Sequence, residues 1–147
     1  MAPDDRSGHW LWRLDAPGWL SAARSELAAG RALAEQRRVA VTHARRAAGM
    51  AVNAVLVALA VEPVDELRWG RSYLDHLRAL GGADEARRHP LSATVQAAAA
   101  RLLTIAVAPS AALVQLTRGP HGAADLALDL ATTIVDECAT LVATRAR

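Results

Sequence analysis

The chain contains no phenylalanine, no lysine and one tyrosine, and its single cysteine is Cys138. One cysteine excludes an internal disulfide bond and a metal site built from several thiolates. The longest apolar stretch, residues 47–61, is interrupted by Asn53 and is too short to cross a bilayer. The first residues are polar and lack the apolar core of a signal peptide. We therefore expect a soluble, cytoplasmic protein that does not bind a membrane.

Several enzyme classes lack their motifs in this sequence. The histidines show neither the HExxH nor the H-x3-H spacing of metal ligands. Gly81-Gly82 is not followed by the lysine of a phosphate-binding loop, and no serine lies in a nucleophile elbow. The sequence therefore predicts no metal and no cofactor, and it gives no support to a metalloenzyme, a kinase or a serine hydrolase.

The absence of lysine means that all 17 basic residues are arginine. This usage is typical of a GC-rich bacterial genome, and guanidinium groups bind phosphate and carboxylate in a bidentate manner. The formal net charge is only +2, whereas domains dedicated to nucleic acids usually carry a much larger positive charge. The composition therefore permits contact with RNA but does not indicate it.

The residues that are abundant favour helices. Apolar residues make up 52% of the chain, alanine is the commonest of them and the strongest helix former, and no segment shows the period-two pattern of a strand. The length is typical of one domain. We predict an all-α fold in which residues 15–147 form an up-and-down four-helix bundle with one or two extra short helices. A flexible N-terminal arm is expected at residues 1–14.

The spacing of apolar residues locates the predicted helices and their faces. Four main helices are expected at 17–36, 38–60, 90–106 and 123–144, with shorter ones at 73–80 and 110–117. Glu26 is expected on the outer face of the first helix. The polar edge of the second helix is assigned to His43, Arg45, Arg46 and Asn53, and its small residues, which would let another helix approach closely, are Ala47, Ala48, Gly49 and Ala51. The inner stripe of the last helix is assigned to Leu126, Leu130, Ile134, Cys138 and Leu141.

Three segments resemble the HEPN domain family. Residues 19–27 (WLSAARSEL) are similar to its first helix, and residues 43–56 (HARRAAGMAVNAVL) to its second, which often reads HAQQAAEKALKALL. Residues 70–77 (GRSYLDHL) correspond to its GHSL segment. The resemblance spans roughly residues 17–143 and implies a four-helix bundle that dimerises. Family members are often metal-independent ribonucleases, and others are silent partners of nucleotidyltransferases or modules that bind nucleotides.

Arg71 and His76 match the Arg-x4–6-His motif of the ribonuclease members. A histidine can move protons between the 2′-hydroxyl and the leaving oxygen, and an arginine can stabilise the developing negative charge. These two are therefore the predicted catalytic residues, with Ser72, Tyr73 and Asp75 as candidate supporting residues. On a straight helix they lie about 140° apart, so catalysis requires an unwound helix start or a second subunit. In the alternative, structural interpretation, Arg71 pairs with Asp75 at i,i+4 spacing.

Two further groups are candidates for contacts with RNA phosphates. His43, Arg45 and Arg46 lie close together on the second predicted helix. Arg118 and His121 flank a turn before the last helix, and a helix N-terminus can bind phosphate. Each group also has a simpler interpretation, as a solvated helix face in the first case and as a turn with incidental charges in the second.

Two classes of function follow from these features. The first is a HEPN-like protein that acts on or binds RNA, as a metal-independent endoribonuclease of toxin or defence type. It would be a homodimer, with an antitoxin or a nucleotidyltransferase as a partner. The alternative is a non-catalytic helical module that binds a nucleotide or a partner protein.

Overall fold

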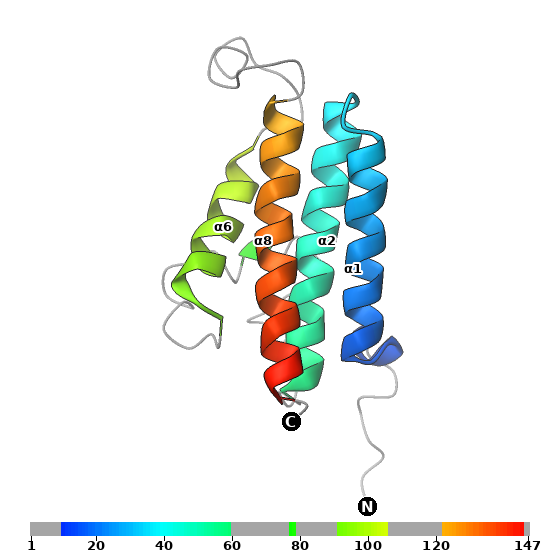
Figure 1. The fold of residues 1–147 in the computed structure, drawn as a ribbon, viewed down its shortest axis with the longest axis vertical. Coiled ribbons are helices and arrows are strands. Elements are labelled where there is room, and N and C mark those ends of the chain that lie inside the picture. Colours follow the sequence, from blue (N-terminus) through cyan, green and yellow to red (C-terminus); the bar gives the residue numbers. More distant parts are fainter. Residues whose placement is uncertain (1–9, 60–76, 79–90, 106–121, 146–147) are drawn as a thin grey trace, which may run out of the picture.

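The computed structural model describes residues 10–59, 77–78, 91–105 and 122–145 (Figure 1). The short 3-10 helix η2 spans Trp10–Arg13, and the α-helices are α1 (Ala16–Ala32), α2 (Arg37–Ala58), α6 (Ala93–Thr104) and α8 (Gly122–Arg145). Residues 77–78 are also helical. The part of the chain that the structure describes contains no strand, so the predicted all-α class is confirmed.

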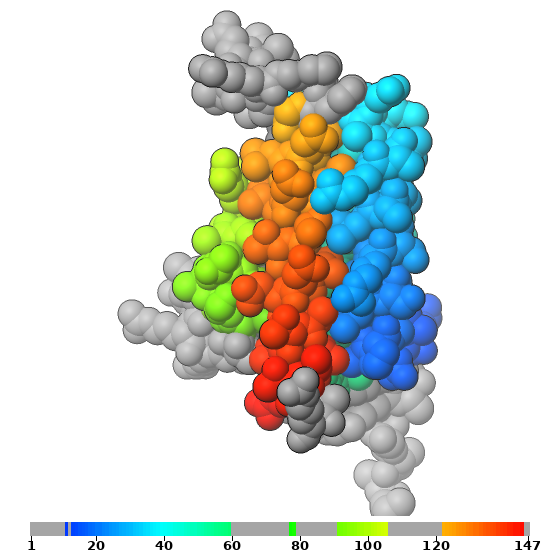
Figure 2. All heavy atoms as spheres, viewed as in Figure 1, coloured from blue at the N-terminus to red at the C-terminus, as the bar shows by residue number. Residues whose placement is uncertain are grey.

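The four α-helices pack as a bundle in which successive helices run in opposite directions (Figure 1). α2 packs most extensively against α1 and α8, whereas α6 packs mainly against α8. α1 also contacts α8. The order across the bundle is therefore α1, α2, α8, α6. Figure 2 shows α8, in orange and red, between α6 and α1 on one face of the molecule.

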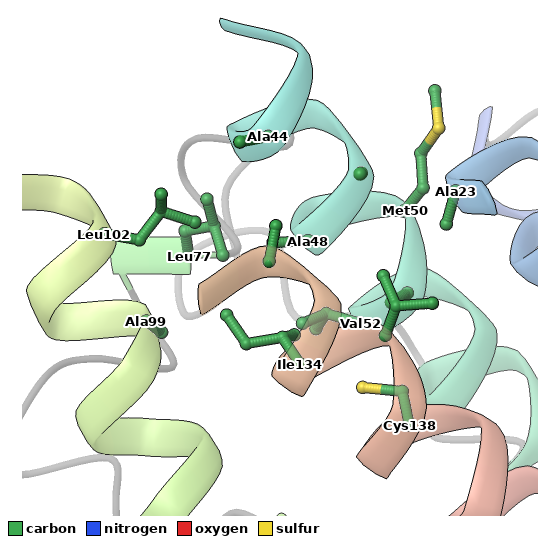
Figure 3. Close-up of a cluster of buried hydrophobic side chains, with 14 of the residues drawn as sticks. Ala23, Ala44, Ala48, Met50, Val52, Leu77, Ala99, Leu102, Ile134 and Cys138 are labelled. Carbon is green, nitrogen blue, oxygen red and sulfur yellow. The ribbon is translucent and has the colours of Figure 1, made fainter. Parts of the chain in front are cut away.

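The second half of α2 is the centre of the bundle. Every residue from 47 to 56 is buried, so this stretch has no exposed face. An α-helix that is apolar on all sides is stable only inside a core, and this one is enclosed by α1, α8 and their neighbours. Its side chains belong to one core cluster with residues of α1, α6 and α8 (Figure 3).

Small side chains bring the helices close to α2. Ala48 and Ala51 on α2, and Ala127 and Ala131 on α8, are completely buried. The distance between packed helix axes depends on the size of the side chains between them, so alanine permits a close approach. The small residues expected to admit another helix are thus covered by helices of the same chain. The predicted homodimer therefore takes no support from them and remains a prediction.

One assignment on α2 is wrong. Asn53 was expected on the polar edge of the helix, but its side chain has an exposure of 0%. The physical reason is the all-round burial of residues 47–56, which leaves no polar edge at this level of α2.

The inner face of α8 also differs in part from the prediction. Ile134 and Cys138 are fully buried, as expected. The three predicted leucines are only partly buried; they are Leu126, Leu130 and Leu141. Deeper positions are taken by Ala127, Leu128 and Ala131. Where two helices approach closely, alanine fits between them, and of the leucines of α8 only Leu128 is fully buried.

Local capping sets the observed helix ends. α1 ends at Ala32: the amide of Leu33 still donates to the carbonyl oxygens of Ala29 and Gly30, each at 3.2 Å, but the backbone of Leu33 itself leaves the helical conformation. Residues 33–36 then form the turn into α2. The prediction that the first helix continues to residue 36 is therefore wrong. α6 begins at Ala93, three residues after the expected start, because the Ser92 side chain accepts a bond from the Val95 amide at 3.4 Å.

The start of the described chain is tied to α1. The carboxylate of Asp15 accepts a hydrogen bond from the Gly18 amide at 2.8 Å and caps α1. The indole Nε1 of Trp19 donates to the Leu11 carbonyl oxygen, also at 2.8 Å, and Leu11 is fully buried. Part of the predicted N-terminal arm is therefore packed on the bundle as η2, and residues 1–9 lie outside the described residues.

Gly30 marks a close approach of α1 to its neighbours and generates a stability prediction. A Cβ atom at this position would lie 2.7 Å from Leu128 Cδ2 and 3.0 Å from His43 Cβ. Alanine gains about 1 kcal/mol of helix propensity over glycine, but overpacking typically costs about 1–3 kcal/mol. We expect Gly30→Ala to lower the free energy of unfolding, measured by urea denaturation.

A second substitution separates this clash from other causes. Leu128→Ala removes the closest atom, so Gly30→Ala should cost less, or become stabilising, in the Leu128→Ala background. The same cost for Gly30→Ala in both backgrounds would contradict the close contact between α1 and α8 at this point.

Cys138 generates a prediction about pH. Burial raises the pKa of its thiol to about 12, and the charge of Glu137 adds to the effect. An unfolded thiol has a pKa of about 8.5, so the contribution is complete below that pH and is lost as the pH rises toward 12. We expect wild type to lose about 2 kcal/mol more stability than Cys138→Ala between pH 7 and pH 10, by urea denaturation. Equal losses in the two proteins would argue against a buried thiol.

Candidate functional site

The structure describes three of the predicted site residues, and all three lie in the first half of α2. They are His43, Arg45 and Arg46. The remaining candidates fall outside the described residues: the predicted catalytic residues Arg71 and His76, the supporting candidates Ser72, Tyr73 and Asp75, and the phosphate-contact candidates Arg118 and His121.

His43 and Arg46 face α1, where both pair with Glu26. Nδ1 of His43 is hydrogen bonded to Oε2 of Glu26, and the Arg46 guanidinium lies 3.2 Å from Oε1. The Glu26 side chain is only 15% exposed, whereas that of Arg46 is 47% exposed. One carboxylate therefore connects two basic side chains of α2 to α1. We call Glu26, His43 and Arg46 the Glu26 cluster.

The prediction that Glu26 lies on the outer face of α1 is wrong. Glu26 precedes the buried Leu27 and follows the buried Ala23 by three residues, so it lies at the margin of the apolar stripe, beside α2. A signal was present in the sequence of α2. His43 and Arg46 are three residues apart and share a helix face, so one carboxylate on a neighbouring helix can reach both.

Arg45 points to the opposite side of the bundle, toward α6. Its guanidinium donates to the carbonyl oxygens of Leu103, at 3.3 Å, and Ile105, at 2.7 Å. These carbonyls belong to the C-terminal end of α6, where orphan acceptors and the negative end of the helix dipole favour a cation. Nε of Arg45 is buried and has no hydrogen-bond partner among the described residues. Arg45 thus caps α6.

A second arginine lies near Arg45. Burial, and after it the positive charge of Arg78, lower the pKa of the Arg45 guanidinium, which nevertheless stays charged at neutral pH. Leu77, which precedes Arg78, is completely buried in the core cluster with Leu102 (Figure 3). Both residues lie within the short helix predicted at 73–80, but nothing in the sequence indicates that Arg78 lies near Arg45.

The basic residues of α2 thus divide between two sides of the helix. His43 and Arg45 are two residues apart, which corresponds to a rotation of about 200° around the axis. α2 carries four arginines and no acidic residue, whereas α8 carries four acidic residues and one arginine. Basic charge is therefore concentrated where the first half of α2 meets α1 and α6.

Two further properties of the described residues bear on function. No group of three His, Cys, Asp or Glu side chains is placed to hold a metal ion in the described ranges. Within the same ranges, no helix combines the length and apolar character needed to cross a bilayer.

Comparisons with known proteins do not assign the chain to a family. No protein-family model, curated protein or solved structure matches it. What is established is an all-α fold with four helices packed as a bundle.

The capping role of Arg45 can be tested by substitution. Arg45→Gln removes two charge-assisted hydrogen bonds to α6. A hydrogen bond to a charged group typically contributes about 1.5–3 kcal/mol to stability. We expect a loss of roughly 2 kcal/mol in the free energy of unfolding, measured by urea denaturation.

Arg38→Gln is the matched control because Arg38 is an exposed arginine of the same helix. It changes the net charge equally and should alter stability by less than about 0.5 kcal/mol. Equal effects of the two substitutions would show that Arg45 contributes only its charge and not a cap on α6.

Proposed function

We propose that this chain is a HEPN-like protein that binds RNA and cleaves it without a metal ion. Arg71 and His76 are the proposed catalytic residues, with the arginine stabilising the charged phosphorane and the histidine transferring protons. Ser72, Tyr73 and Asp75 are proposed to support them. The active form is proposed to be a homodimer, in which a second copy can complete the pair.

The observation that carries this proposal is the position of Leu77 and Arg78. His76 is joined by a peptide bond to Leu77, which is completely buried in the core. The next residue, Arg78, is exposed and close enough to Arg45 for their like charges to interact. Arginine is suited to bidentate contacts with a phosphate of RNA, so a pair of neighbouring guanidinium groups supports the proposal. Arg45 and Arg78 thus form a basic corner of the bundle, and Arg78 follows the proposed motif by two residues in the sequence.

The described contacts also favour a second candidate, a non-catalytic module that binds a nucleotide or a partner protein. His43 and Arg46 pair with Glu26, and Arg45 caps α6. These interactions stabilise the bundle without any ligand. In this alternative the basic residues of α2 are structural, and only the remaining surface is functional.

RNA cleavage by the purified full-length chain separates these candidates. We expect wild type to cleave single-stranded RNA in the presence of EDTA, because no metal takes part. His76→Ala and Arg71→Ala should each reduce the rate at least about 100-fold, the usual contribution of an acid–base or charge-stabilising group.

The control is Arg38→Gln, which removes an exposed positive charge outside the proposed site. It should keep the wild-type rate, and the circular dichroism of all variants should match wild type. An inert wild type, or a His76→Ala variant as active as wild type, would contradict the ribonuclease proposal and favour the binding module.

A further inference from the structure

The Glu26 cluster has a feature that its structural role does not require. The hydrogen bond to Glu26 occupies Nδ1 of His43, whose side chain is 22% exposed. Nε2 of His43 has no partner among the described residues and is not one of the buried unpaired atoms. It is therefore in contact with solvent. A histidine held through one nitrogen presents the other in a fixed direction.

Arg46 extends the same surface. It follows His43 by three residues, so the two side chains share one face of α2. Glu26 engages one terminal nitrogen of the guanidinium, and the side chain is 47% exposed. A guanidinium has five N–H donors in a planar arrangement, so donors remain for a ligand. His43 and Arg46 meet at the two oxygens of the same carboxylate, so their remaining donors belong to one small surface.

The charge of the cluster suits an anion of a particular kind. Glu26 contributes one negative charge and Arg46 one positive charge, and a His43 ring that donates from Nε2 to an anion while Nδ1 donates to Glu26 carries a further positive charge. A dianion gains more from two such cationic donors than a monoanion does. A phosphate monoester is a dianion near neutral pH with three terminal acceptor oxygens. A phosphodiester within an RNA strand carries a single charge.

We propose that the Glu26 cluster is a binding site for a phosphate monoester, separate from the basic corner at Arg45. His43 donates from Nε2 and Arg46 from its free guanidinium nitrogens, while Glu26 positions both. The ligand is the terminal phosphate of either a mononucleotide or an RNA end. The site lies on the α1 side of α2, so it does not depend on the proposed ribonuclease activity.

The experiment follows the imidazole nitrogens of His43 by 15N NMR in the full-length chain. Inorganic phosphate is titrated against sodium chloride of equal ionic strength. Adenosine 5′-monophosphate is then compared with a short RNA that carries a 5′-phosphate and with the same RNA carrying a 5′-hydroxyl. We expect phosphate, but not chloride, to shift the Nε2 resonance with a dissociation constant on the order of a millimolar. The 5′-phosphate RNA should shift it, and the 5′-hydroxyl RNA should not.

Two variants of equal charge complete the test. Arg46→Gln should weaken phosphate binding at least about tenfold, whereas Arg38→Gln should leave it unchanged. Arg46 is half exposed, so its substitution is expected to leave the fold intact. The proposal is overturned if phosphate and chloride act alike, or if the two variants bind phosphate equally. Comparison of the mononucleotide with the 5′-phosphate RNA shows which of the two supplies the phosphate. An absence of RNA cleavage would contradict the ribonuclease proposal but would not affect phosphate binding at the Glu26 cluster.

Discussion

The structure depends on the close packing of small side chains around the second half of α2. Alanine buries little apolar area, so an alanine-rich core gains stability only if its helices approach closely and leave few voids. α1 and α8 meet this requirement on two sides of α2, and Gly30 of α1 is a point where even one added carbon would meet its neighbours. The bundle therefore has little tolerance for added volume near its centre.

This constraint also determines where polar groups can lie. Residues 47–56 of α2 have no exposed face, so the basic residues of this helix are confined to its first half. There, His43 and Arg46 reach Glu26 on α1, and Arg45 reaches the end of α6. The same residues thus hold the outer helices to α2 and concentrate positive charge. A phosphate ligand at either side would use groups that the fold has already positioned.

Features encoded by neighbouring residues could be predicted, and features that depend on distant packing could not. The buried thiol of Cys138 could be predicted because the residue lies on an apolar stripe of the last helix. The inward face of α8 could not be predicted, because alanine and leucine are both apolar and only the helix spacing decides which lies deeper. The bridging role of Glu26 requires α1 to be placed beside α2. Arg71 and His76 lie outside the described residues, so their convergence remains a prediction.

Native-state hydrogen exchange tests the central position of α2 most directly. If residues 47–56 are enclosed on every side, their amides should exchange only through global unfolding, with a free energy equal to that from denaturant unfolding. The amides of α6, which packs mainly against α8, should exchange through smaller openings at lower free energy. Exchange of residues 47–56 at free energies as low as those of α6 would contradict the account of α2 as the buried centre of the bundle.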